Sequence, residues 1–69
     1  MKFVICERIK SLRKKHGYSQ FDIADMLNMS QNAYSELESG KRRLDIERLE
    51  QIATHYKITL LQLIPPPEK

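Results

Sequence analysis

Apolar residues recur every three or four positions along most of this chain, which is the spacing of an amphipathic helix. In the first segment, Ile5, Ile9 and Leu12 follow this spacing, and similar stripes recur in the later segments. No stretch carries the alternation of apolar and polar residues that marks a half-buried strand. The pattern predicts an all-α protein with five helices, over residues 4–16, 20–27, 31–39, 46–56 and 60–64.

The boundaries of these helices carry their own signals. Residues that favour helix N-caps stand directly before four of them, at Ser19, Ser30, Asp45 and Thr59. Each cap lies between two apolar residues placed as a hydrophobic staple, namely Tyr18 and Ile23, Met29 and Tyr34, Leu44 and Leu49, and Ile58 and Leu63. Residues that suit a left-handed helix end follow at Gly17, Asn28 and Gly40. Local signals that agree with one global pattern favour a folded bundle.

At 69 residues the chain has room for one domain with a small core. We expect this domain over residues 1–64, followed by a short Pro-rich tail over residues 65–69. Cys6, the single cysteine, excludes an intramolecular disulfide and suits a half-buried helix position. No apolar run approaches the length of a membrane span, and charges come too early for a signal peptide, so the expected location is the cytoplasm.

The net charge of +3 is unevenly distributed. Residues 1–16 hold six Lys or Arg against one acid, residues 17–40 hold four acids and no base, and residues 41–69 hold six bases and four acids. Two interpretations remain open. These charges are ordinary solvated faces, or they are two clamps for phosphates on either side of the helix pair.

The helices over residues 20–27 and 31–39, joined by a tight turn, have the form of a helix-turn-helix. The second opens with Gln31 and Asn32, whose amides suit adenine edges in the DNA major groove, at about 1–3 kcal/mol of discrimination per bidentate contact. A basic run, Lys41-Arg42-Arg43, follows this helix. Helix N-termini also offer free N–H groups to phosphates. These features predict double-stranded DNA as the partner.

The chain resembles the Cro/CI-type (XRE-like) helix-turn-helix family of bacterial and phage regulators, over about residues 7–64. The residues that carry the resemblance are Arg8-Ile9-Lys10, Leu12-Arg13, Ser19-Gln20, Ile23-Ala24, Leu27-Asn28, Ser30-Gln31, Ser35, Leu37-Glu38, Gly40-Lys41, Leu49, Ile52-Ala53 and Leu60. The resemblance implies a compact five-helix bundle, similar to the lambda-repressor DNA-binding domain, that binds operator DNA as a homodimer.

The resemblance also implies roles for single residues. It implies that Gln20 contacts a phosphate and supports Gln31, and that Arg13 and Glu38 form a structural ion pair. The residues expected to read bases are Gln31, Asn32, Ser35 and Glu36. The residues expected to contact the DNA backbone are Ser19, Gln20, Ser30, Lys41, Arg42 and Arg43.

Two residues depart from the family pattern. Glu36 is acidic where the family often has an amide or a base, so it either accepts from cytosine N4, repels the backbone or is silent. Phe21 replaces a usually polar residue on the outer side of its helix. It is either one exposed aromatic side chain or a contact with a deoxyribose or a partner protein.

Leu61 and Ile64 are left pointing outward if Leu60 and Leu63 anchor the last helix. We expect these two residues in a two-fold dimer interface that sets the recognition helices roughly 34–36 Å apart. The alternative is one solvent-exposed leucine.

The function expected from these features is sequence-specific transcriptional regulation, as a homodimeric repressor on a palindromic operator. An activator is also compatible with the acids of the fourth helix. The rival class is a protein-interaction module, antitoxin-like or otherwise regulatory, with weak nonspecific DNA binding. His16 and His55 lie on separate predicted helices without an acid and nucleophile, so neither an enzyme nor a metal site is expected. No cofactor or small-molecule ligand is indicated.

Overall fold

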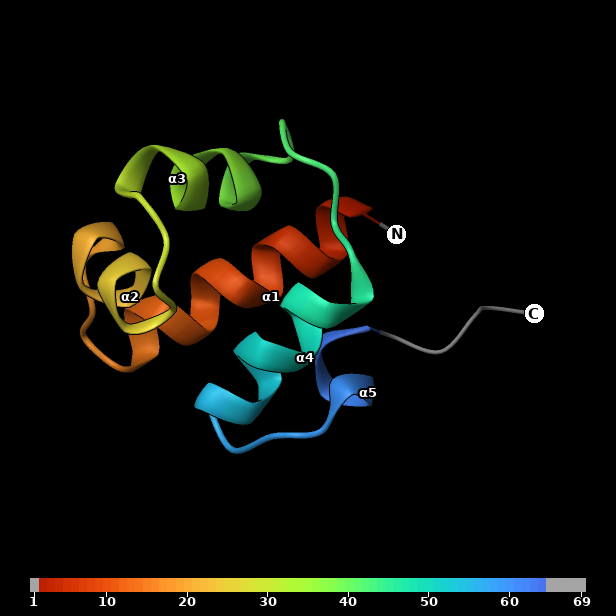
Figure 1. Cartoon of the computed structure of the whole chain (residues 1–69). Helices are drawn as coiled ribbons and strands as arrows, with labels where there is room; N and C mark the ends of the chain where they lie inside the picture. Colours follow the sequence, from red (N-terminus) through yellow and green to blue (C-terminus); the bar gives the residue numbers. More distant parts are fainter. Residues whose placement is uncertain (1, 65–69) are drawn as a thin grey trace.

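The computed structural model describes residues 2–64, and within them every predicted helix is present. In order, the helices are α1 (Lys2–Lys15), α2 (Gln20–Met26), α3 (Gln31–Ser39), α4 (Ile46–His55) and α5 (Leu60–Leu63) (Figure 1). Their ends lie within two residues of the predicted ends, a difference typical of frayed helix termini. The predicted tail over residues 65–69 lies outside the described residues.

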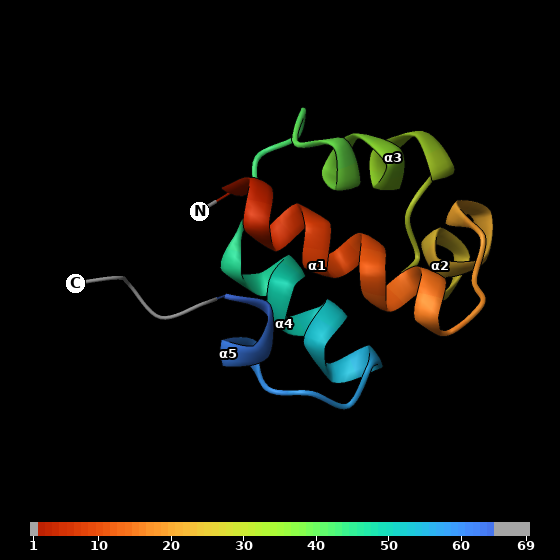
Figure 2. The same cartoon turned by 180° about the vertical axis from the view of Figure 1, so that it is seen from behind.

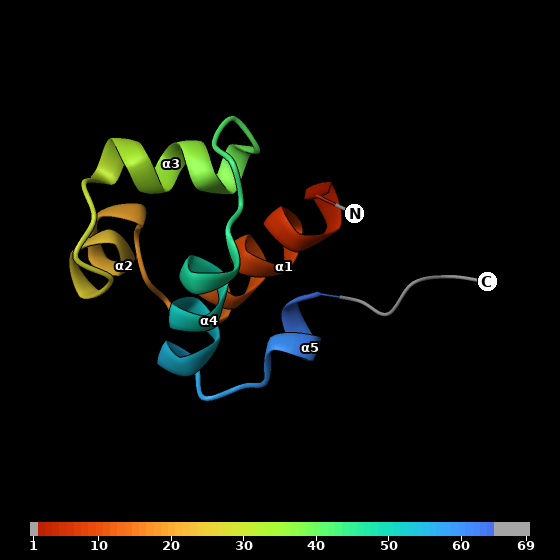
Figure 3. The same cartoon turned by 45° about the vertical axis from the view of Figure 1, so that its right-hand side comes forward.

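Helix α1 runs through the middle of the molecule, with the other helices packed around it (Figures 1 and 2). Helices α2 and α3 pack against each other, and α1 contacts α3 on one side and α5 on the other. Helices α4 and α5 pack together on the side away from α3 (Figure 3). The bundle therefore presents α3 along one edge. No described helix has both the length and the apolar character that a membrane crossing requires.

The core contains the apolar stripes that the sequence predicts. Its fully buried large side chains come from all five helices: Ile9, Ile23, Leu27, Tyr34, Leu37, Ile52 and Leu63. Leu12 and Leu60, which were expected in the core, are only half-buried and pack at its edge. Cys6 is buried rather than half-buried; its thiol donates to the carbonyl of Leu37 at 3.3 Å, and burial raises its pKa.

The caps of the helix-turn-helix form as predicted. The Ser19 hydroxyl accepts from the Asp22 N–H, and the Asp22 carboxylate accepts from the Ser19 N–H, each at 3.0 Å. The Ser30 hydroxyl accepts from the first turn of α3 at 3.1 Å. Between the two helices, Asn28 takes the left-handed conformation with φ of 60°. This residue allows the sharp turn because its short polar side chain tolerates that region.

Helix α4 fixes the end of α2 from outside the motif. The side-chain amide of Gln51 donates to the carbonyl of Leu27 at 3.1 Å, and the Gln51 oxygen accepts from Arg48 Nη1 at 2.6 Å. A carbonyl at a helix C-terminus lacks an intrahelical donor, so this bond satisfies it. The angle between α2 and α3 thus depends on residues more than 20 positions further along the chain.

Candidate nucleic-acid interface

Helix α3 separates sharply into a buried side and an accessible side. Tyr34 and Leu37 are buried, whereas Gln31 and Asn32 in its first turn are exposed. Ser35 and Glu36 lie at intermediate exposure, and the Glu36 side chain is 40% accessible. The four residues predicted to read bases are therefore all reachable from solvent. Their contacts with bases remain predictions.

A buried ion pair connects α1 to the end of α3. Arg13 Nε lies 2.8 Å from Glu38 Oε2, and Arg13 Nη2 lies 3.1 Å from Glu38 Oε1. The two side chains are 11% and 4% accessible. Burial alone would raise the pKa of the Glu38 carboxyl, but the hydrogen bonds from Arg13 and Gln20 outweigh it and hold that pKa below its ordinary value. The pair is the one that the resemblance implies, and it is bidentate.

Gln20 takes part in the network around this ion pair. Its amide nitrogen donates to Glu38 Oε1 at 3.1 Å, and a hydrogen bond to a carboxylate is stronger than one between two neutral amides. Gln20 thus joins α2 to the buried ion pair. The support of Gln31 by Gln20, which the resemblance implies, stays a prediction. A phosphate contact by Gln20 and by the two serine caps, Ser19 and Ser30, stays a prediction.

The basic residues of α1 do not form one clamp, because they point to two different sides. Lys10 and Lys14 line a hollow of about 360 Å³ together with Gln20 and Ser35, next to the accessible side of α3. Lys2 also lies on this side: its Cε is 3.9 Å from the position that a Cβ on Gly40 would occupy. These lysines are candidate phosphate contacts that sequence reasoning did not separate from the others.

Arg8 and Lys15 lie on the opposite side of α1. They line a groove of about 690 Å³ with apolar residues that include Val4 and Ile58. Arg8 Nη1 donates to the carbonyl of Gln62 in α5 at 3.0 Å. Their charge is directed away from α3, so they are not placed to contact DNA bound there.

Replacing Lys10 and Lys14 with glutamine is expected to weaken DNA binding and its salt dependence. For every phosphate that the protein no longer neutralises, the slope of log affinity against log salt falls by about 0.9. The matched control is Arg8→Gln with Lys15→Gln, which removes the same charge from the other side and should leave the slope unchanged. Titrations of a labelled duplex at several salt concentrations measure both. An equal fall of the salt slope in the two double variants would contradict the assignment of these bases to a DNA-facing side and another side of α1.

The turn after α3 folds back onto the helix. Gly40 takes φ of 85°, and the N–H groups of Lys41 and Arg42 both donate to the carbonyl of Glu36, at 2.9 and 3.2 Å. This turn brings Arg42 Nη2 within 3.0 Å of Glu36 Oε1. Helical spacing does not predict this pair, because six positions exceed the reach of neighbours on one helix face. Lys41 and Arg43 are exposed.

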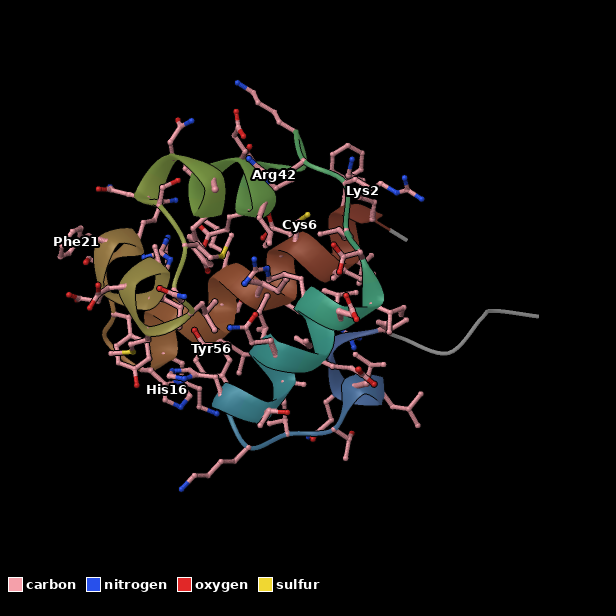
Figure 4. The ribbon with its side chains drawn as sticks, viewed as in Figure 1. Lys2, Cys6, His16, Phe21, Arg42 and Tyr56 are labelled. Atoms are coloured by element: carbon pink, nitrogen blue, oxygen red, sulfur yellow. The ribbon has the colours of Figure 1, made fainter. Side chains whose placement is uncertain are left out.

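The remaining candidates lie elsewhere on the surface. Phe21 points outward from α2 and is 62% accessible (Figure 4), and Leu61 on α5 is 73% accessible. Ile64, expected to point outward, is half-buried and packs against the core. Its N–H donates to the carbonyl of Leu60, so it lies one helical turn after Leu60, on the same side of the helix. A role for Leu61 or Ile64 in a dimer stays a prediction.

His16 and His55 belong to an aromatic cluster at the ends of α1 and α4. Each packs against Tyr56, with ring centroids 4.9 Å apart for His16 and 5.1 Å apart for His55. Over residues 2–64, no group of three or more His, Cys, Asp or Glu side chains is placed to hold a metal ion. The cluster is therefore explained by packing.

Comparisons with known proteins agree with this architecture. A family model described as helix-turn-helix matches residues 9–63. Control protein C.MunI from a Mycoplasma species is 36% identical over 63 residues, which cover 90% of this chain and 85% of that protein. The HTH-type transcriptional regulator DdrOP3 from Deinococcus deserti is 35% identical over 60 residues, which cover 87% of this chain and 46% of that protein.

The antitoxin PezA from Streptococcus pneumoniae is 28% identical over 61 residues, which cover 88% of this chain and 39% of that protein. The chain thus spans less than half the length of the Deinococcus and Streptococcus proteins. No solved structure gave a significant match. The family match covers most of the chain and includes the helix pair α2 and α3. The chain therefore belongs to the XRE-type helix-turn-helix family of DNA-binding regulators.

Proposed function

We propose that this chain is a sequence-specific transcriptional regulator that binds a short palindromic operator as a homodimer. The observation that carries the proposal is the position of Gln31 and Asn32, both exposed in the first turn of α3. An amide there can donate to adenine N7 and accept from its N6 amine. The lysines on one side of α1 and the turn over residues 40–43 supply positive charge beside the later turns of this helix.

Repression by occupancy is the simplest mechanism, because it requires only that the bound protein covers the promoter. A dimer with α3 in the major groove covers a promoter that overlaps its operator, and transcription falls as the protein accumulates. Relatives named as a control protein and as transcriptional regulators support a role in gene control. The proposal places the protein in the cytoplasm with its DNA, and it requires neither catalysis nor a cofactor.

A protein-interaction module is the second candidate. The exposed Phe21 and Leu61 side chains favour it, as does the relative named as an antitoxin. This function would leave DNA affinity weak and independent of sequence. Its candidate surfaces contain Phe21 and Leu61 rather than Gln31, so one substitution at Gln31 separates the two candidates.

Gln31→Ala is expected to remove the sequence preference at the base that Gln31 contacts, while the fold stays intact. Selection from random duplex DNA first identifies the preferred site. The variant should then bind that site about 5- to 150-fold more weakly, the range that corresponds to one missing bidentate hydrogen bond to a base, and bind random duplex as before. Thr54→Ala on α4, also exposed, is the control and should change neither affinity.

The outcomes separate the candidates. A palindromic consensus that disappears in Gln31→Ala supports the regulator, and sedimentation of the complex counts the protomers. Equal weak binding to every duplex would refute sequence-specific regulation and favour the interaction module.

A further inference from the structure

We infer that Glu36 and Arg42 act as one coupled specificity element. In it, Glu36 holds Arg42 away from DNA phosphates until a cytosine amine replaces Arg42 as the partner of the carboxylate. The inference deepens the proposed function and rests on it. It assigns a role to the acidic residue on an otherwise DNA-compatible helix, and it predicts that base contact and phosphate contact are made together.

The backbone after α3 brings the two side chains of the pair together. Glu36 lies one helical turn after Asn32, so both occupy the accessible side of α3. The left-handed Gly40 reverses the chain, and the Arg42 N–H donates to the Glu36 carbonyl at 3.2 Å. Arg42 Nη2 then reaches Glu36 Oε1 at 3.0 Å. The helix cap thus brings the two side chains within reach of each other.

The charges near α3 explain why the pair matters. Of the carboxylates on α3, Glu38 is buried against Arg13, so Glu36 is the one that faces solvent. Without Arg42, its negative charge would face phosphates of the same sign. With Arg42 bound to it, the reading side of α3 carries no net charge, but Arg42 is then unavailable to a phosphate.

DNA offers Glu36 a replacement donor at particular bases only. In the major groove, cytosine N4 is the amine that typically donates to a glutamate. Where cytosine is in register, Glu36 accepts from it and releases Arg42 to a phosphate. Where it is not, Arg42 stays on Glu36 and one phosphate contact is missing. The pair can exchange in this way because its side chains are 40% and 47% accessible, and exposed ion pairs are weak.

The test compares Glu36→Gln, Arg42→Gln and the double variant with the unchanged protein. Each is titrated at several salt concentrations with the selected site, the site with its cytosine pair changed, and a random duplex of equal length. Glu36→Gln should bind random duplex more tightly, with a salt slope steeper by about 0.9, because Arg42 is free to reach a phosphate. It should also lose its preference for cytosine by about 5- to 150-fold.

Arg42→Gln should lower the salt slope on the selected site by about 0.9 and leave the slope on random duplex unchanged. Because each substitution disables the same element, the double variant should not show the sum of the two effects on cytosine preference. Arg43→Gln is the matched control: it forms no ion pair among the described residues, so it should lower the slope equally on both duplexes.

Three results would overturn the inference. In the first, Glu36→Gln alters neither the cytosine preference nor the salt slope on random duplex, while the parent protein still selects a consensus. This result refutes the coupling and leaves the proposed function standing. The second is loss of cytosine preference with no change in that slope, which shows that Glu36 reads a base without restraining Arg42. The third is the absence of any consensus for the unchanged protein, in which case the proposed function fails and the coupling fails with it.

Discussion

Glu38→Ala is expected to lower the free energy of unfolding by about 3–5 kcal/mol, which is the usual effect of removing one partner from a buried ion pair. The substitution leaves the Arg13 guanidinium, 11% accessible, without its counter-charge, and it also removes the acceptor for the Gln20 amide. A domain of this size has a total stability of only about 3–10 kcal/mol. Chemical denaturation followed by circular dichroism measures the loss.

Glu36→Ala is the matched control on the same helix, because its carboxylate forms an exposed pair. We expect it to change the unfolding free energy by less than about 1 kcal/mol. Replacing Arg13 and Glu38 together by apolar residues of similar volume should cost much less than Glu38→Ala, since no charge is then left buried. A loss below about 1 kcal/mol in Glu38→Ala would contradict the structural role of the pair.

The Glu38 carboxylate also makes the free energy of unfolding depend on pH. Its pKa in the folded state lies below the ordinary value of 4.5, so the folded protein binds fewer protons than the unfolded chain in this range. The contribution of ionised Glu38 to the free energy of unfolding is therefore complete at neutral pH. It starts to fall near pH 4.5 and is lost as the pH falls through the lowered pKa. Unfolding measured from pH 7 to pH 3 should show a smaller dependence on pH in Glu38→Gln than in the unchanged protein.

Leu63→Ala is expected to cost about 2–5 kcal/mol, as is usual when a buried leucine is replaced by alanine. Helix α5 has four residues, and Leu63 is its one fully buried side chain, with no measurable exposure. Truncation leaves a cavity where α5 meets the core, and a single helical turn has little structure of its own to retain it. Thermal and chemical unfolding both report the loss.

Leu61→Ala provides the control within the same helical turn. Its side chain is 73% accessible, so the stability of the single chain should change little. If Leu61 lies in a dimer interface, the variant should instead shift the association equilibrium, which sedimentation velocity measures over a range of concentrations. Unchanged association would remove Leu61 from the predicted interface. A Leu63→Ala loss equal to that of Leu61→Ala would contradict the assignment of the core in α5.

Much of this fold could be predicted because its signals are local. A helix needs only a periodic apolar stripe, and its ends need only a cap within three residues, as at Ser19, Ser30 and Gly40. The exposure of Gln31 and Asn32 follows from the same period, since Tyr34 and Leu37 must face the core. Family resemblance supplied the Arg13–Glu38 pair, which joins residues 25 positions apart and which no local pattern predicts.

The tertiary structure decided the contacts that depend on how each helix is rotated and on which groups meet across the chain. The rotation of α1 about its own axis places its basic residues on two sides. Lys10 and Lys14 lie on the side of α3, whereas Arg8 and Lys15 lie on the side of α5. The buried carboxylate of Glu38 accepts from the amide of Gln20, a contact that no local pattern in the sequence predicts. The folding back of residues 40–42 sets Arg42 on Glu36. Sequence determined the helices through short-range spacing and capping; the partners of the polar side chains required three-dimensional packing, because charge and hydrogen bonding act on distance in space.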